Sequence, residues 1–283
     1  MLEAYVSSHR PSWRELFLPW KMLSKIFSYK GLLWQFTKRE VERRYKGTLL
    51  GCFWSFMSPL LMLAVYTIVF GYIFGGSYGH PGETKTQFTL ALFCGLLLWD
   101  VIAGSIAASP SLIIGHANFV TKVIFPLEIL PLSMIFSTLV HTSIGFIPLL
   151  LLLIVSQGTI PLSAISLPLI VIPIVFYTLG MSWILSALGV FLRDIRALIP
   201  AVITVLMFLS ALFFPITAVP LPWRWGIMLN PAAVLISMGR NALVFSQWPN
   251  LTIYSLELFL SIVTAILGYA IFIKLKPAFA DVL

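Results

Sequence analysis

No charged residue occurs between Thr48 and Phe74, and this run is long enough to cross a membrane as a helix. The segment directly before it, 38–46, is strongly basic, and ten of the chain's 18 Lys and Arg residues fall within the first 46 positions. Lys and Arg residues that flank a membrane span stay on its cytoplasmic side. We therefore expect the N-terminus to lie in the cytoplasm.

The composition of the whole chain points to a membrane fold. Of its 283 residues, 59% are hydrophobic and only 10% are charged, against roughly 25% charged in soluble domains. A soluble fold could not cover so much apolar surface, so lipid must be the solvent for most of it. The basic residues stand beside apolar runs, which indicates membrane orientation and not nucleic-acid binding.

Apolar runs of about 20 residues or more predict an all-α integral membrane protein with six spans. The predicted spans are 48–74, 88–113, 127–155, 162–191, 197–219 and 251–273. Both termini are then cytoplasmic, and all but three of the 18 basic residues, namely Lys85, Arg224 and Arg240, lie on the inner side. The chain divides into a cytoplasmic N-terminal region 1–47, a transmembrane domain 48–275 and a cytoplasmic tail 276–283.

The outer segment 220–250 is apolar but interrupted by prolines. Asn230-Pro231 predicts an N-cap followed by proline at the first helical position. The helix it begins, about 232–245, measures roughly 20 Å and is too short for a full crossing. We predict that it re-enters the membrane, with a helix lying on the membrane surface as the alternative.

The basic N-terminal region 1–47 contains two amphipathic stretches. Trp13–Tyr29 has an apolar stripe and a basic face, the pattern of a helix lying in the membrane interface. A second helix follows Gly31, with Trp34 heading an apolar row that continues through Thr37, Val41 and Tyr45. We interpret the N-terminal region as a gate at the cytoplasmic entrance. A segment that only fixes the membrane topology would also explain the charges. The gate residues are Trp13, Phe17, Trp20, Phe27, Arg39, Arg43, Arg44 and Tyr45.

Four motifs in order resemble a known family. They are Lys38–Gly51 with Trp54 and Pro59; Asn118–Val123 with Phe125–Glu128; Arg193-Asp194-Ile195; and Phe214-Pro215-Ile216 with Leu229-Asn230-Pro231. Together they resemble the permease subunit of polysaccharide-exporting ABC transporters, the exporters of O-antigen, capsule and teichoic acid. The resemblance covers nearly the whole chain from about residue 34. It implies a homodimer in the bacterial inner membrane, bound to two separate ATPase subunits.

The resemblance also implies where the ATPase docks. The family's coupling helix between spans two and three corresponds here to about His116–Lys122. The sequence contains no Gly-x-x-x-x-Gly-Lys-Ser/Thr phosphate loop, so ATP and Mg would be held by the partner and this chain would carry no cofactor or metal. Arg193–Arg196 is either a second docking point or a simple charged turn. The docking candidates are His116, Asn118, Phe119, Lys122, Arg193, Asp194 and Arg196.

Aromatic residues in spans one and five suit a conduit for a polysaccharide. A sugar ring has an apolar face that stacks on an aromatic plane and can slide along it. Ordinary lipid-facing or packing roles are the alternative for any single residue. The channel candidates are Phe53, Trp54, Phe56, Tyr66, Phe70, Phe208 and Phe213, and the outer-gate candidates are Trp223, Trp225, Asn230 and Arg240.

Few polar residues interrupt the spans, and this favours a polymer permease over a proton-coupled transporter. The acids are Asp100, Glu128 and Glu257, with His141 as a neutral candidate, and Asp100 is the most central. The predicted function is a permease, not an enzyme, that exports a lipid-linked polysaccharide, with O-antigen as the expected cargo. Its partners are a second copy, two ATPase subunits, the polysaccharide and membrane lipids. A capsule or teichoic-acid exporter, an ABC exporter of drugs or lipids, and a membrane enzyme acting on lipid-linked sugars are the alternatives.

Overall fold

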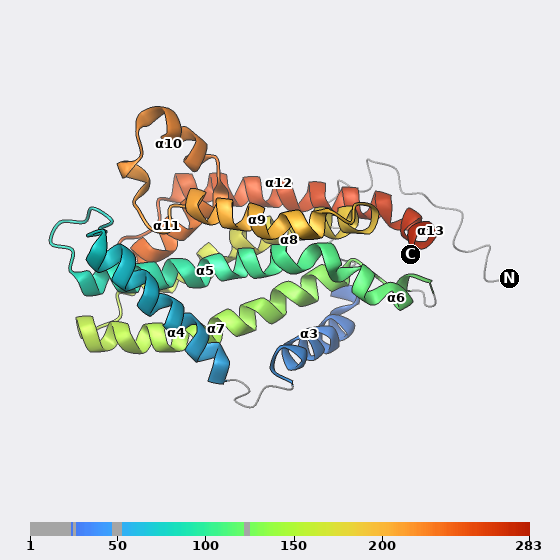
Figure 1. Cartoon of the computed structure of the whole chain (residues 1–283), viewed down its shortest axis with the longest axis horizontal. Coiled ribbons are helices and arrows are strands. Elements are labelled where there is room, and N and C mark those ends of the chain that lie inside the picture. Colours follow the sequence, from blue (N-terminus) through green and yellow to red (C-terminus); the bar gives the residue numbers. More distant parts are fainter. Residues whose placement is uncertain (1–23, 25–26, 47–52, 122–124) are drawn as a thin grey trace.

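The structure is a computed structural model that describes residue 24 and residues 27–46, 53–121 and 125–283. All regular elements within these residues are helices. In Figure 1, α5, α7, α8, α9 and α12 run roughly along the long axis of the molecule. Helices α3, α6 and α13 gather at one end, here called the α6 end, and α10 and α11 lie at the other, the α11 end.

Four helices are long and apolar enough to cross a membrane. They are α5 (Lys85–Leu112), α7 (Ile129–Gln157), α8 (Leu167–Phe191, preceded by the 3-10 turn Leu162–Ser166) and α12 (Leu251–Leu275). In the most apolar window of α5, 72% of residues are buried, against 28–39% in the other three, so α5 is the central helix. Thr84 and Gln87 form a reciprocal capping box that fixes the start of α5.

Helices α8 and α12 approach each other closely because two glycines face each other. A Cβ added at Gly180 would lie 2.3 Å from the Thr264 carbonyl oxygen, and one at Gly268 would lie 2.2 Å from the Gly180 oxygen. Small residues allow such backbone contact between membrane helices. Trp183 and Tyr269 pack edge to face beside this contact, with ring centroids 5.2 Å apart.

Two further apolar helices are shorter than the predicted first and fifth spans. Helix α4 (Trp54–Tyr66) continues as the π-helix η3 (Thr67–Ile73). Residues 48–52 of the predicted span lie outside the described residues. Helix α9 (Ile195–Leu209) has 15 residues, about 22 Å at ~1.5 Å per residue. The prediction that this span extends to 219 is wrong, since the helix ends at Leu209.

Side chains from the segment 220–250 explain where α9 ends. The Asn230 amide donates to the Leu209 carbonyl and the Ser210 hydroxyl, and Arg240 donates to the Ala211 carbonyl. Ala211 itself has a φ of +50°, which turns the chain out of the helix. The terminal groups of α9 thus find partners in α11 and at its N-cap instead of in a further helical turn.

The segment 220–250 forms α10 (Leu221–Met228) and α11 (Pro231–Leu243). The Asn230 side chain accepts a hydrogen bond from the Ala232 N–H, as the predicted N-cap requires. Most side chains of α11 are buried, and the helix packs on α5 and α8. Protein, and not solvent, therefore covers this half-length helix, which is unlike a helix lying on a membrane surface.

Candidate transport and coupling site

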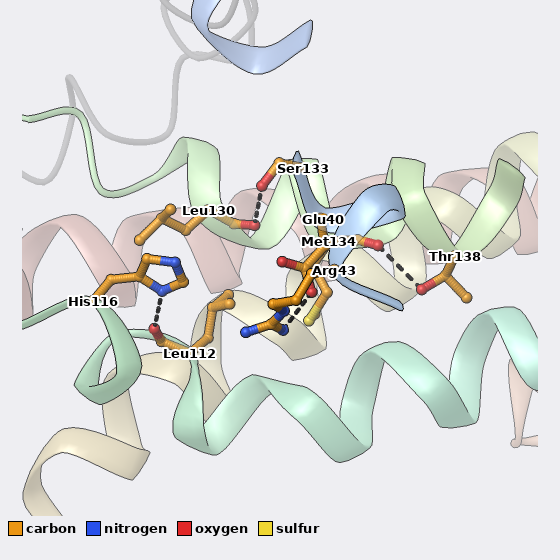
Figure 2. A network of polar contacts seen from close by, with 8 residues as sticks. All are labelled: Glu40, Arg43, Leu112, His116, Leu130, Ser133, Met134 and Thr138. Atoms are coloured by element: carbon orange, nitrogen blue, oxygen red, sulfur yellow. Dashed lines mark hydrogen bonds and ion pairs between the residues drawn. The ribbon is translucent and has the colours of Figure 1, made fainter. Parts of the chain in front are cut away.

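A short helix lies at the α6 end, at the position predicted for the coupling helix. Residues Ile114–His116 form a 3-10 turn and Ala117–Thr121 form α6. A ring nitrogen of His116, Nδ1, lies 2.9 Å from the Leu112 carbonyl oxygen and ties the turn to the end of α5 (Figure 2). Asn118 is exposed, whereas Phe119 is half-buried, and Lys122 lies outside the described residues. An exposed polar residue beside a half-buried aromatic ring is compatible with docking, and the docking role of Asn118 and Phe119 stays a prediction.

Three aromatic rings connect α6 and the segment after it to α3 (Lys30–Tyr45). The Phe36 ring of α3 lies 5.6 Å from Phe119 and 5.1 Å from Phe125, measured between centroids. Phe119 and Phe125 stack on each other at 4.7 Å. Helix α3 also packs along α7. Helix α6 and the predicted gate helix α3 are therefore in direct side-chain contact.

The buried face of α3 agrees with the predicted one only in part. In the predicted row, Thr37 is buried and Val41 half-buried, but Trp34 is 69% exposed. Leu33 and Phe36, outside that row, are half-buried. The sequence pattern placed Trp34 on the buried face because it is the largest apolar residue of this segment, and this placement is wrong. Phe36 faces the interior because α6 and the segment after it supply two aromatic rings that contact it.

The arginines of α3 border a cavity of about 230 Å³ between α3, α5 and α7. Arg43 forms a 2.5 Å ion pair with Glu40, one turn away on the same helix, and Arg44 lines the same cavity (Figure 2). The rest of its lining is Gly104, Ala108, Met134, Ser137 and Thr138. Of the other predicted gate residues, Arg39 and Phe27 are exposed, Tyr45 ends α3, and Trp13, Phe17 and Trp20 lie outside the described residues.

The C-terminal segment completes the α6 end, a feature that the sequence analysis missed. Lys276 Nζ lies 2.8 Å from Glu128 Oε2 just before α7, and the Trp183 indole donates to the Glu128 carbonyl. Phe279 at the start of α13 (Phe279–Val282) is fully buried against Phe191 and Phe272. Lys276 and Phe279 of the predicted tail thus pack on this end, whereas 280–283 are exposed. The polar residue Glu128 at the start of α7 was the one available signal.

The turn between α8 and α9 presents the second docking candidate. Arg193, Asp194 and Arg196 are all exposed. A surface hollow of about 690 Å³ lies along this turn and is lined by 191–195, 197 and 198. An exposed charged turn beside a surface hollow could be recognised by a partner through both charge and shape. The docking role of this turn stays a prediction.

Four of the predicted channel aromatics come together in one cluster. Phe70 stacks on Phe213 at 4.2 Å, Tyr66 meets Phe213 edge to face at 5.3 Å, and Phe208 lies 5.6 Å from Phe213. We call these four residues the aromatic cluster. The remaining candidates, Phe53, Trp54 and Phe56, lie at the start of α4, away from it. The elements that carry the cluster, α4, η3 and α9, also expose apolar side chains, namely Leu61, Met62, Val65, Ile68, Leu198, Val205 and Leu209.

Arg240 occupies a different environment from the other outer-gate candidates. Trp223 and Trp225 are 75% and 67% exposed on α10, whereas Arg240 is only 2% exposed. Its guanidinium carbon lies 3.9 Å from the centroid of the Tyr78 ring, and Nη1 donates to the Ala211 carbonyl over 2.8 Å. Burial raises the pKa of Tyr78 to about 12, so this ring is neutral. Arg240 therefore links the loop after η3 to α9 and α11 as a buried cation.

The Tyr78 loop is itself well ordered by hydrogen bonds. The Tyr78 hydroxyl donates to the Leu212 carbonyl, and Glu83 accepts from the backbone N–H groups of Tyr78 and Gly79. His80 stacks on Phe245 at 3.7 Å just beyond α11. The loop, the end of α9 and α11 thus form one connected unit at the α11 end.

Comparison with known proteins identifies the class to which this architecture belongs. Residues 31–244 match the ABC-2 type transporter membrane family. The chain belongs to this family. It is 30% identical over 254 residues to the O-antigen export system permease protein RfbA of Klebsiella pneumoniae, which covers 89% of this chain and 95% of that protein.

Two further relatives are named as polysaccharide export or transport proteins. The chain is 28% identical over 220 residues to the O-antigen export system permease protein RfbA of Myxococcus xanthus, covering 77% of this chain and 82% of that protein. It is 20% identical over 213 residues to the polysialic acid transport protein KpsM of Escherichia coli, covering 73% and 78%. Among the described residues, no group of three or more His, Cys, Asp or Glu side chains comes together to hold a metal ion.

Proposed function

We propose that this ABC-2 permease exports a lipid-linked polysaccharide, O-antigen, from the cytoplasm across the bacterial inner membrane. The observation that carries the proposal is the similarity along 89% of the chain to an O-antigen export permease. The similarity to a polysialic acid transporter is lower, which favours O-antigen over a capsule polymer. The aromatic cluster offers ring faces of the kind on which sugars stack.

The working unit is two copies of this chain and two ATPase subunits. Helices α4 and α9 carry both exposed apolar side chains and members of the aromatic cluster, and a second copy covering those side chains would enclose that cluster in a conduit. Each copy has six spans, with α4–η3 and α9 as the first and fifth, and both termini lie in the cytoplasm. Segment 220–250 re-enters the membrane from the outer side, where α11 is covered by α5 and α8.

ATP hydrolysis on the partner subunits acts through α6. In this proposal the ATPase docks on α6 and on the Arg193–Arg196 turn, and its movement passes through Phe119 to Phe36 and so to α3. The arginines of α3 receive the polar end of the lipid-linked polymer beside the cavity that they line. The exposed tryptophans of α10 stand at the exit.

Reconstitution of the permease–ATPase complex in liposomes tests this function. We expect lipid-linked O-antigen to stimulate ATP hydrolysis, whereas lipid-linked capsule polymer or simple lipids stimulate it much less. Phe36→Ala removes two aromatic contacts worth together about 1–3 kcal/mol and should lower that stimulation roughly fivefold or more. Basal hydrolysis and complex yield should stay unchanged, because Phe36 lies inside the permease.

Trp34→Ala is the matched control, since Trp34 lies on the same helix and is largely exposed. Equal losses in the two variants would contradict the proposed route through Phe36. Stimulation by simple lipids alone would favour a lipid or drug exporter. Hydrolysis or transfer of the glycan without ATP would favour a membrane enzyme.

A further inference from the structure

A second cavity lies deeper in the fold, between α4, α5, α7 and α9. Its volume is about 280 Å³, just under the range of roughly 300–1,000 Å³ typical of small-molecule pockets. Its size suits a single ring and excludes an oligomer. The lining residues are Met62, Tyr66, Phe93, Leu96, Leu97, Trp99, Asp100, Ala103, His141, Thr142, Gly145 and Met207.

Three polar residues converge on this otherwise apolar cavity. Asp100 comes from the middle of α5, and His141 and Thr142 come from α7. An ionisable side chain within a membrane span is costly and marks a functional site by default. The Thr142 hydroxyl oxygen is buried and has no hydrogen-bond partner among the described residues. A buried hydroxyl without a partner gains a hydrogen bond when a polar ligand arrives.

The cavity also borders the aromatic cluster. Tyr66 lines the cavity and is the ring that meets Phe213 edge to face. Trp99 and Phe93 add aromatic surface from α5. The same small volume therefore presents ring faces, a carboxyl group, an imidazole and a hydroxyl, which is the combination that recognises a sugar by C–H stacking and hydroxyl hydrogen bonds.

Gly104 brings this cavity next to the one beside α3. A Cβ on Gly104, which lines the α3 cavity, would lie 3.8 Å from Asp100 Oδ1 and 3.9 Å from Arg44 Nη2. Asp100 therefore stands at the boundary between the two cavities. The two neighbouring cavities extend from Arg44 on the gate helix, past Asp100, to Tyr66 of the aromatic cluster.

We propose that the cavity around Asp100, His141 and Thr142 is a binding site for one pyranose ring of the transported glycan. This inference rests on the proposed function and assigns its substrate a site in the wall of the conduit. Asp100 accepts hydrogen bonds from ring hydroxyls, Thr142 supplies one more partner, and Tyr66 contacts the apolar face of the ring. An acyl chain would leave the Thr142 hydroxyl without a hydrogen-bond partner, so it fits the cavity less well.

Photoaffinity labelling tests the site with the permease–ATPase complex in lipid nanodiscs. The probe is an octyl glucoside with a diazirine on the sugar, and the competitors are unlabelled octyl glucoside and an octyl oligo-oxyethylene ether. We expect crosslinks on the peptides that contain 96–103 and 141–145, displaced by the glucoside and not by the ether. Equal displacement by the ether would mean an alkyl-chain site and would overturn the proposal.

Two variants and a matched control sharpen the result. Thr142→Val and Asp100→Asn should weaken labelling about two- to tenfold, the effect of one lost hydrogen bond of roughly 0.5–1.5 kcal/mol. Ser133→Ala is the control, because Ser133 lies on the same helix α7, is equally buried, already donates to the Leu130 carbonyl (Figure 2) and lines neither cavity. Equal labelling in all three variants would refute the site.

The readout separates this inference from the proposed function, because labelling requires no transport. If wild-type complex fails to move lipid-linked O-antigen but is still labelled specifically, the function is wrong and the sugar site stands. If transport proceeds and labelling is unaffected by Thr142→Val and Asp100→Asn, the site is wrong and the function stands.

Discussion

Replacing Arg240 by methionine is expected to lower the free energy of unfolding by about 2–4 kcal/mol, the sum of one hydrogen bond to a charged group and one buried cation–π contact. Methionine keeps most of the side-chain volume but leaves the Ala211 carbonyl without its donor and the Tyr78 ring without its cation. The Tyr78 loop, the end of α9 and α11 should then separate more easily. Unfolding of the purified permease measures the effect.

Arg224→Met supplies the comparison for this variant. Arg224 donates to the Val219 and Thr217 carbonyls from a partly exposed position on α10, so solvent can replace these bonds. We expect a loss of less than about 1 kcal/mol there, as for most surface substitutions. Equal destabilisation by the two variants would mean that Arg240 is not the special link that its burial indicates.

Gly268→Ala is expected to destabilise the permease by about 1–3 kcal/mol or more, the cost of overpacking a close contact. The added methyl group would lie 2.2 Å from the Gly180 carbonyl oxygen, and backbone cannot move aside as a flexible side chain can. The yield of folded permease and its unfolding midpoint should both fall.

Gly226→Ala should raise the free energy of unfolding, whereas Gly268→Ala should lower it, so the two variants together are a strict test. Gly226 lies in helix α10 with no atom within 4 Å of an added Cβ. Alanine in an open helical position is favoured over glycine by roughly 0.5–1 kcal/mol. If Gly268→Ala were neutral or stabilising as well, α8 and α12 would not be held by direct backbone contact.

The long spans could be predicted from sequence because hydropathy alone determines them. A run such as Lys85–Leu112 must leave water, and it does so as a helix whatever its neighbours are. The Asn230 N-cap of α11 was predictable for a similar reason, since capping depends on residues close together in the chain.

Features that depend on distant partners could not be predicted in this way. Helix α9 stops at Leu209 because Asn230 and Arg240, far along the chain, bond to the groups around Ser210 and Ala211. Lys276 pairs with Glu128, a residue 148 positions earlier. Hydropathy could not indicate these pairings, because each concerns a single polar side chain and its partner.

In the candidate site, too, the residue types were predictable from sequence and their contacts were not. The aromatic residues of α4 and α9 were recognisable as a set by composition, but their meeting at Phe213 required the turn after α9. On α3, residue size suggested Trp34 as the buried ring, whereas contact with Phe119 selects Phe36. Asp100 was identified as the most central acid, yet its cavity required four helices to come together.

The location of completed polymer in cells that lack this permease tests the central claim most directly. Labelled sugar is followed into full-length lipid-linked glycan, and the fraction outside the inner membrane is measured with and without the permease. Export predicts that full-length polymer accumulates in the cytoplasm when the permease is absent and that reintroduced permease returns it to the outer face. Polymer that is missing or chemically altered, or that still reaches the outer face in undiminished amount, would contradict the account.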